Sequence, residues 1–193
     1  MKALWTKQDL IAATNAIDPS LNFLNKINGI SGISIDDRTI QPGDLFIAFK
    51  GDKFDGHDFV QSAITKGASG VIVSDLKLAK KYKGLLVNNT NKALINIAKF
   101  SRNRFKGTTI ALTGSSGKTS TKHLLSSSLK IYGKTHSTKE NNNNIVGLSL
   151  TLSRLDPDCR YCVLELGINN VGEMEELTKL ALPNIALITN VTN

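Results

Sequence analysis

The sequence predicts an α/β fold in two parts, because short apolar segments alternate with segments of helical periodicity along most of its 193 residues. We expect a small N-terminal α/β domain over residues 1–106. Residues 107–193 should then form the first part of a mostly parallel sheet with helices on both faces. Alternating strands and helices favour this architecture, since each helix connects two parallel strands and covers one face of the sheet. A glycine-bounded loop between the first strand and first helix of the second part supports the same class.

The first part begins with a predicted helix. Thr6 can cap its N-terminus, Asp9 lies at the third position, and the helix continues to about Ala16. Gln41-Pro-Gly-Asp44 predicts a turn, because proline and glycine suit its central positions. The other elements expected here are short strands within 32–49, including a buried strand at 45–49, a loop at 51–56, a helix at 59–66, strands at 71–73 and 85–87, and a helix at 90–104.

The second part, after Lys106-Gly107, alternates more strictly. Its expected elements are a strand at 108–113, a helix from Lys118 to about Tyr132, a short strand at 134–137, a helix at 145–154, a strand at 161–166, a helix at 172–181 and a strand at 185–190. In such sheets, ligands bind beyond the carboxyl ends of the strands. Functional residues are therefore expected at that edge.

Composition and charge indicate which partners and which cellular compartment to expect. The chain carries 24 basic and 16 acidic residues, a net charge of +8 that favours anionic partners. No apolar run approaches the roughly 20 residues of a membrane span, and the N-terminus lacks the apolar stretch of a secretory signal. Basic and aromatic residues do not alternate as in single-strand binders, so we expect a cytoplasmic protein without nucleic-acid or membrane partners. Cys159 and Cys162 lead into an apolar strand, which favours reduced cysteines in or near the core.

Residues 113 to 119 read Thr-Gly-Ser-Ser-Gly-Lys-Thr and follow an apolar, β-branched strand. Backbone N–H groups in a tight glycine turn can bind phosphate oxygens, and the following helix N-terminus adds about half a positive charge. Lys118 can reach the β- and γ-phosphates, and the Thr119 hydroxyl can bind Mg²⁺. Two residues separate the glycines, fewer than in the usual P-loop, so an ordinary Gly-Ser loop with a solvated lysine is the alternative. The residues assigned to the nucleotide, which the resemblance described below identifies as ATP, are Gly114, Ser115, Ser116, Gly117, Lys118, Thr119 and Ser120.

Other polar side chains are expected at the same sheet edge. Glu165 is the only charge in the apolar run 162–166 and lies near its carboxyl end, so it can complete a Mg²⁺ site with Thr119. The alternative is a glutamate at the rim that faces solvent. Thr189 and Asn190 end the next strand at this edge. The four asparagines at 141–144 are either low complexity or a set of donors and acceptors for a sugar.

Together these segments resemble the ATP-dependent Mur ligases. Matches run from about residue 30 to the last residue, and several are specific in combination. Within the family, the loop and the Asn-Asn segment look most like the members that add D-alanyl-D-alanine to UDP-N-acetylmuramoyl-tripeptide. The segments that carry the resemblance are Asp36-Asp37-Arg38, Gly43 to Ala48, Gly51, Asp55-Gly-His-Asp-Phe59, the phosphate loop, Asn143-Asn144-x-x-Gly147, Glu165-Leu-Gly167, Gly172-Glu173 and Pro183 to Asn190.

The resemblance implies an amide ligation in cell-wall synthesis, with ATP and Mg²⁺ as cofactors. ATP phosphorylates the terminal carboxylate of UDP-N-acetylmuramoyl-tripeptide, and the amine of D-alanyl-D-alanine then displaces phosphate. Lys118 and Glu165 are implied to be catalytic, and Thr119 and Glu165 to hold the metal. The residues implied to bind the UDP-linked substrate are Ser34, Arg38, His57, Asn143 and Asn144.

The sequence also departs from the family. Asp37 replaces a usual serine, and its charge would repel a diphosphate, so a direct ligand role is not expected there. Members of the family are more than twice as long, so we expect these 193 residues alone to have no turnover. The alternatives are a non-catalytic fragment that binds the UDP-sugar peptide, or a Mur ligase that adds a single amino acid. A P-loop kinase or GTPase would need a base-specificity motif and a longer glycine loop, and neither is visible.

Overall fold

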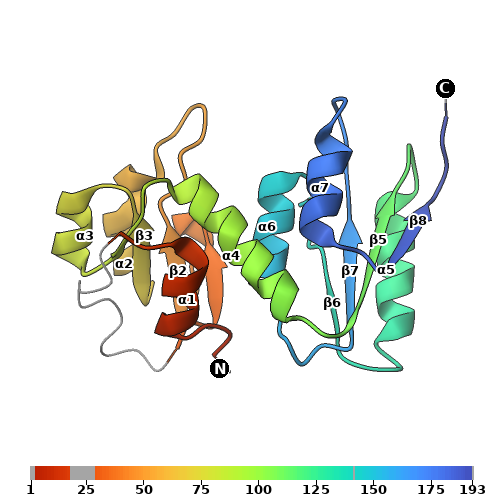
Figure 1. Ribbon diagram of the computed structural model, residues 1–193, viewed down its shortest axis with the longest axis horizontal. Coiled ribbons are helices and arrows are strands. Elements are labelled where there is room, and N and C mark those ends of the chain that lie inside the picture. The colour runs from red at the N-terminus through yellow and green to blue at the C-terminus, as the bar shows by residue number, and fades with distance from the viewer. Residues whose placement is uncertain (1–2, 18–28, 141, 193) are drawn as a thin grey trace. The chain divides into compact units, whose positions relative to one another are not determined.

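The computed structural model describes residues 3–17, 29–140 and 142–192. The chain forms two compact units, which divide between Ile97 and Ala98 (Figure 1). Each unit contains a four-stranded parallel sheet, which confirms the predicted α/β class. None of the helices in the described ranges has the length and apolar character needed to cross a bilayer.

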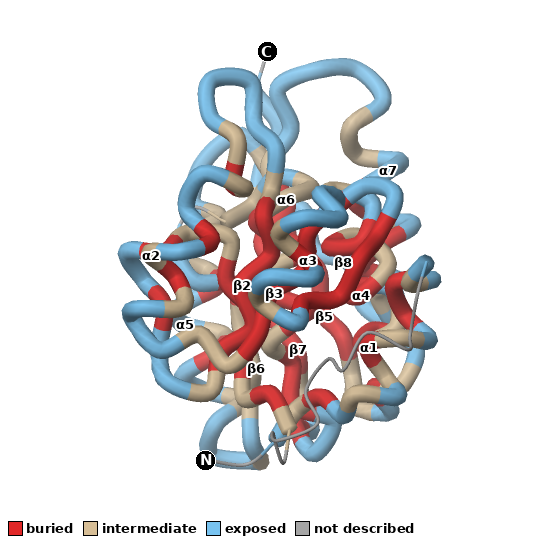
Figure 2. The backbone as a smooth tube through the Cα atoms, turned by 90° about the vertical axis from the view of Figure 1, so that its left-hand side faces the viewer, coloured by how far each residue is buried: buried red, intermediate tan, exposed pale blue. Residues whose placement is uncertain are grey.

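The first unit is built around the sheet β1-β2-β3-β4. Its strands are short and buried, as Figure 2 shows for β2 and β3, and the side chain of Phe46 is completely enclosed. Short 3-10 turns follow β1 and β2, at Asp37–Thr39 and Gly56–Phe59. The helices and strands are α1 (Lys7–Thr14), β1 (Gly32–Ser34), β2 (Asp44–Ile47), α2 (Val60–Thr65), β3 (Gly70–Val73), α3 (Leu76–Tyr82), β4 (Leu85–Leu86) and the start of α4 (Thr90–Arg104).

Local hydrogen bonds explain where these elements begin and end. The predicted cap of α1 is confirmed, because Thr6 Oγ1 accepts from the Asp9 N–H at 3.1 Å and Asp9 accepts in return from the Thr6 N–H at 3.0 Å. The strand expected to reach residue 49 ends at Ile47, because the Phe49 N–H turns back to the Ile47 carbonyl at 2.7 Å. The predicted helix at 90–104 is confirmed at both ends.

The second unit contains the sheet β6-β7-β5-β8, again with every neighbouring pair parallel. The predicted alternation of strands and helices is confirmed along the whole unit. The strand expected to reach residue 190 ends at Ile188, because Thr189 and Asn190 bond to the loop after β5. The elements are β5 (Thr108–Thr113), α5 (Lys118–Leu129), β6 (Thr135–Ser137), α6 (Ile145–Ser153), β7 (Tyr161–Glu165), α7 (Glu173–Ala181) and β8 (Ile185–Ile188).

The side chains of β7 show which helices cover each face of this sheet. Cys162 and Leu164 join the core beneath α6 and α7, whereas Glu165 contacts Thr119 of α5. Successive strand residues point to opposite faces, so α5 covers one face while α6 and α7 cover the other. Cys159 and Cys162 are both buried and form no disulfide, as predicted for reduced core cysteines.

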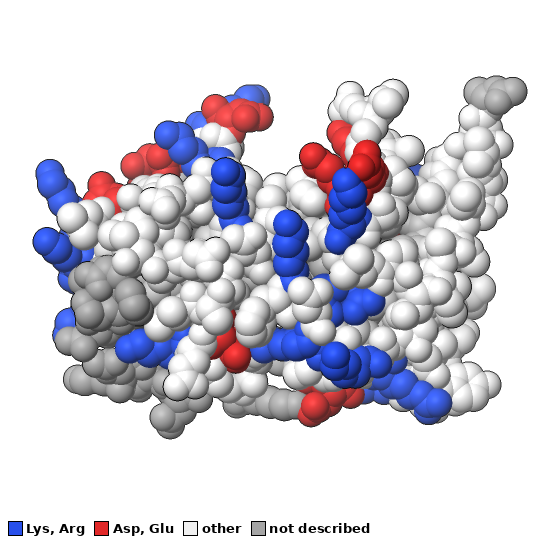
Figure 3. Space-filling model, in the orientation of Figure 1, with Lys and Arg blue, Asp and Glu red and all other residues white. Residues whose placement is uncertain are grey.

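Strand β8 forms one edge of the sheet and is exposed along its length. Ile185 is 51% exposed and Ile188 is 64% exposed. In the view of Figure 3, the surface over β8 carries no charged side chain, whereas acidic side chains gather at α7. Three of them lie in the first turn of α7: Glu173, Glu175 and Glu176. Their negative charges interact favourably with the positive end of the helix dipole there.

Candidate functional site

The glycine loop of the second unit connects the carboxyl end of β5 to the N-terminus of α5. Gly114 has a φ of 144° and Gly117 a φ of 77°, both in the region that favours glycine. A Cβ at Gly114 would lie 2.0 Å from Thr189 Oγ1, so this position also requires the absence of a side chain. The loop is thus shaped by its glycines, and the first N–H groups of α5 lie behind it without acceptors inside the helix.

The end of β8 holds the loop from one side. The Ser115 N–H donates to the Asn190 carbonyl at 3.0 Å, and the Ser116 N–H donates to Asn190 Oδ1 at 2.9 Å. Thr189 Oγ1 donates to the Ser116 carbonyl at 2.6 Å. The polar residues expected at this sheet edge are therefore brought directly against the loop.

Lys118 lies over the loop that precedes it. Its ammonium group donates to the Gly114 carbonyl at 2.7 Å, across the mouth of the glycine turn. The side chain is half-buried, and it starts from the first residue of α5. This position suits a cation that would exchange a carbonyl for a phosphate oxygen.

Glu165 is the last residue of β7, which pairs with the strand that leads into this loop. It is 1% exposed, which excludes the alternative of a rim glutamate that faces solvent. Thr119 Oγ1 donates to Glu165 Oε2 at 3.1 Å and lies 3.3 Å from Oε1. The Glu165 N–H donates to Thr138 Oγ1 at 3.0 Å, which fixes the end of β7. The hydroxyl and carboxylate predicted to share a metal are therefore in direct contact.

The same carboxylate has a partner that the sequence did not predict. Lys122 is 1% exposed, and its Nζ lies 3.1 Å from Glu165 Oε2 and donates to the Glu140 carbonyl at 3.0 Å. The available signal was its spacing, because Lys122 follows Thr119 by three residues and Lys118 by four on one helix. Residues at that spacing share a helix face.

The two asparagines assigned to the substrate occupy structural positions around this centre. Asn143 Nδ2 donates to Glu165 Oε1 at 3.1 Å, and its side chain packs so closely on Gly167 that a Cβ there would lie 2.7 Å from Asn143 Cγ. Asn144 caps α6, since its Oδ1 accepts from the Gly147 N–H at 2.8 Å. Asn141 lies outside the described residues.

The other three substrate candidates lie in the first unit, where Arg38 lines a pocket of about 380 Å³ and Ser34 and His57 are not among its lining residues. Arg38 forms an ion pair with Asp36 at 2.7 Å, and the side-chain hydrogen bond from Arg38 lowers the pKa of the Asp36 carboxyl. Ser34 and His57 brace the loops, since Ser34 Oγ donates to the Asp36 carbonyl and His57 Nδ1 contacts Asp55 Oδ1 at 2.5 Å. The pocket is lined by Ile35, Asp36, Asp37, Arg38, Phe49, Gly51, Phe54, Gly56 and Phe59.

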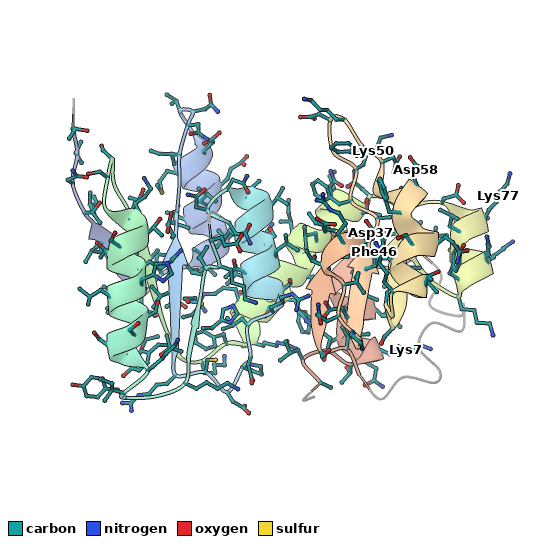
Figure 4. All side chains as sticks on the ribbon, turned by 180° about the vertical axis from the view of Figure 1, so that it is seen from behind. Lys7, Asp37, Phe46, Lys50, Asp58 and Lys77 are labelled. Atoms are coloured by element: carbon teal, nitrogen blue, oxygen red, sulfur yellow. The ribbon has the colours of Figure 1, made fainter. Side chains whose placement is uncertain are left out.

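Asp37, labelled in Figure 4, has hydrogen-bond partners within the first unit. Lys66 Nζ and Ser62 Oγ each donate to its Oδ2 at 2.6 Å. These hydrogen bonds, that of Lys66 first, lower the pKa of the Asp37 carboxyl. The repulsion expected from an aspartate beside a diphosphate is thereby reduced, because Lys66 compensates its charge.

The residues of the second unit fit a magnesium ion. Thr119 and Glu165 offer oxygen ligands 3.1 Å apart, beside a loop that suits phosphates. Mg²⁺ usually takes one or two protein oxygens and completes its shell with water and substrate phosphates, so two ligands suffice. The described residues contain no group of three or more His, Cys, Asp or Glu that could form an all-protein metal site.

Comparison with known protein families gives two matches that adjoin along the chain. Residues 29–102 match the model described as the Mur ligase family, catalytic domain. Residues 112–193 match the Mur ligase middle domain.

Curated relatives include a UDP-N-acetylmuramoyl-tripeptide–D-alanyl-D-alanine ligase from Buchnera aphidicola subsp. Baizongia pistaciae, 44% identical over 185 residues, which are 94% of this chain and 40% of the relative. The enzyme of the same name from Escherichia coli K12 is 39% identical over 165 residues, 84% of this chain and 36% of the relative. The chain thus spans about two-fifths of the length of these relatives.

Solved structures agree with this similarity. A crystal structure of MurF from Acinetobacter baumannii superposes with a TM-score of 0.79 at 35% identity, over 95% of this chain and 40% of the other. MurF ligase from Thermotoga maritima, solved in complex with ADP, gives a TM-score of 0.64 at 32% identity, over 82% of this chain and 37% of the other.

Proposed function

The chain belongs to the Mur ligase family and is of the MurF type, and from this premise we propose that it forms the substrate-binding and ATP-binding parts of a D-alanyl-D-alanine-adding ligase. Residues 1–106 would bind UDP-N-acetylmuramoyl-tripeptide, and residues 107–193 would bind ATP with Mg²⁺. The terminal carboxylate of the tripeptide attacks the γ-phosphorus of ATP, and ADP leaves. The amine of D-alanyl-D-alanine then attacks the acyl phosphate, loses a proton, and releases inorganic phosphate. We place this reaction in the cytoplasm.

The observation that carries the proposal is the contact of Thr119 with Glu165 behind a glycine loop at one sheet edge. Phosphoryl transfer depends chiefly on positioning and on neutralising charge, so it needs a cradle, a cation and a metal site. The loop supplies the first and Lys118 the second. When bound, Mg²⁺ would neutralise charge on the transferred phosphate from its place on Thr119 and Glu165.

Each assigned residue has a role in this proposal. Gly114 to Ser120 would surround the phosphates, with the N–H groups at the N-terminus of α5 directed to them, because those of Ser115 and Ser116 are held by Asn190. Lys118 moves from the Gly114 carbonyl to the γ-phosphate, and Glu165 directs the Thr119 hydroxyl. In the first unit, Arg38 faces the pocket that would take the nucleotide end of the substrate, while Ser34 and His57 keep its loops in place.

Asn143 and Asn144 have a less direct role. Both side chains already have partners in the fold, in Glu165 and in the N-terminus of α6. We propose that they position the loop which faces the sugar-peptide. Their remaining amide groups are the ones available to that ligand.

Nucleotide binding tests the second unit. Titration of the 193-residue chain with a fluorescent ATP analogue should give saturable binding that strengthens with Mg²⁺. Lys118→Met should weaken it by about tenfold or more, because it removes a charge-assisted bond to phosphate. The matched control is Lys130→Met, at the other end of the same helix and exposed to solvent. Equal affinities of these two variants would contradict the assignment.

Assays of turnover and of substrate binding test the other two parts of the proposal, the expected lack of turnover and the role of the first unit. The chain covers about two-fifths of its relatives, and we propose that these residues alone do not turn over. ATP, UDP-N-acetylmuramoyl-tripeptide and D-alanyl-D-alanine should together release no phosphate above background. Calorimetric titration with the UDP-linked tripeptide should still show binding to the first unit, weakened by Arg38→Ala. A silent titration would count against the assigned pocket.

A further inference from the structure

Lys122 is the most deeply buried lysine ammonium in the described part of the chain. The side chain is 1% exposed, in the middle of α5. A charge taken out of water is strongly destabilising unless it is paired and hydrogen-bonded. Lys122 meets this condition through Glu165, whose side chain is 2% exposed, and through the Glu140 carbonyl.

The contacts around Glu165 divide between its two oxygens. Oε2 receives Lys122 Nζ at 3.1 Å and the Thr119 hydroxyl at 3.1 Å, and Oε1 receives Asn143 Nδ2 at 3.1 Å. Three donors from two segments of the chain therefore surround one carboxylate. Its orientation toward Thr119 is fixed by neighbours on both sides.

Two lysines of α5 lie on one face but serve different groups. Lys118 contacts the Gly114 carbonyl in the glycine loop, whereas Lys122, one turn later, contacts Glu165. The side-chain contacts of Lys122 in the described part of the chain are to Glu165 and the Glu140 carbonyl, and none is to residues 114–117. Its contact with the phosphate site is therefore made through Glu165.

We propose that Lys122 is a positioning residue for the metal site: its ammonium group holds the Glu165 carboxylate against Thr119, in the arrangement that Mg²⁺ with nucleotide requires. This inference rests on the proposed nucleotide function. Residues that orient metal ligands typically change metal affinity by about 10- to 100-fold when they are removed. Lys122 should accordingly affect the magnesium-dependent part of nucleotide binding and leave the magnesium-free part intact.

The experiment compares dissociation constants of a fluorescent ATP analogue in EDTA and in saturating Mg²⁺. The ratio of the two constants measures the gain from magnesium. In Lys122→Met this gain should fall about tenfold, while the constant in EDTA stays within about twofold. Lys122→Arg keeps the charge but changes the shape of the side chain. Its magnesium gain should therefore lie between that of the unsubstituted chain and that of Lys122→Met. Lys130→Met is the matched control and should keep the full gain.

Several results would overturn the proposal. The first is a Lys122→Met variant that keeps the magnesium gain of the unsubstituted chain. The second is an equal loss in EDTA, which would show that Lys122 acts on the loop instead. If the unsubstituted chain binds no nucleotide, the proposed function fails and this inference with it. A magnesium gain that survives Lys122→Met overturns only the inference.

Stability measurements keep the test valid if Lys122→Met folds poorly. Removing one partner leaves a buried charge alone, whereas Lys122→Met combined with Glu165→Gln removes both charges. The double variant should melt at a higher temperature than Lys122→Met alone, as circular dichroism would record. A double variant that melts lower would contradict the pairing. If Lys122→Met does not fold, Lys122→Arg carries the magnesium test, and an undiminished gain there overturns the proposal.

Discussion

Replacing Asp37 with alanine should destabilise the first unit by about 2 kcal/mol, because two hydrogen bonds within the unit are lost. The bond from Ser62, at 2.6 Å, contributes about 1 kcal/mol. The bond from Lys66 is charge-assisted, but that side chain is 45% exposed, so water screens it and its share is also nearer 1 than 3 kcal/mol. Asp37 itself is only 12% exposed, which keeps both bonds in place.

Urea unfolding followed by tryptophan fluorescence measures this effect in the correct unit. The chain has one tryptophan, Trp5, which lies in the first unit and is 1% exposed. The control is Asp58→Ala, at an exposed aspartate of the same unit that is also labelled in Figure 4. It should change the free energy of unfolding by less than about 0.5 kcal/mol. Equal effects of the two substitutions would refute the reasoning.

The pH dependence gives a second check on the same bonds. The pKa of the Asp37 carboxyl is lowered in the folded chain, and its unfolded value is about 3.9. The stabilisation is therefore fully present above the unfolded pKa and is lost as pH falls through the folded pKa. The difference in unfolding free energy between the unsubstituted chain and Asp37→Ala should shrink below about pH 4. A difference that stays constant from pH 7 to pH 3 would mean that the carboxylate charge plays no part.

Four further predictions concern the second unit. Gly114→Ala should cost about 2–4 kcal/mol in thermal or urea unfolding and weaken ATP-analogue binding, since its Cβ would meet Thr189 Oγ1 at 2.0 Å. Asn144→Ala should cost about 1 kcal/mol by circular dichroism, through loss of the α6 cap. Leu152→Ala should cost about 2–5 kcal/mol, because this side chain of α6 is completely buried in the core of the second unit. Burial raises the pKa of Cys162 to about 12, so its thiol should resist iodoacetamide until the chain unfolds, as mass spectrometry would show. Rapid labelling of Cys162 in the folded chain, or unchanged stability in any of the three substitutions, would contradict the respective contact.

The sequence predicted the second unit well, because its strands and helices are long enough to show their periods. The apolar run before Gly114 and the spacing after it marked a strand, a turn and a helix, and the structure has all three. Glu165 was recognised as the one charge in an apolar run. Element ends were less predictable, since the end of β8 depends on bonds to a loop more than 70 residues away in sequence.

The first unit held more that the sequence did not reveal. Asp37 stood out as a departure from the family pattern, and its charge was expected to be unfavourable beside a diphosphate. The structure gives it Lys66 and Ser62 as partners, which lie 29 and 25 residues later. Such a pairing depends on how α2 packs beside the turn at Asp37–Thr39, and a single sequence has no pattern that reports this packing.

Lys122 shows why a buried charge is hard to recognise from sequence. On a helix, a lysine among serines and threonines is ordinarily assigned to the solvent face, and α5 contains six serines and threonines. Lys122 differs from such lysines in its spacing, because it follows Thr119 by three residues and Lys118 by four, and these two residues are assigned to the metal and the phosphates. A residue one turn after both must lie on the face that they direct toward the sheet edge. An ammonium group buried on that face is destabilising unless it is paired, and Glu165 is the charge that β7 carries to the same edge. The two residues can therefore be paired by combining the 3.6-residue period of α5 with the position of Glu165 at the carboxyl end of its strand.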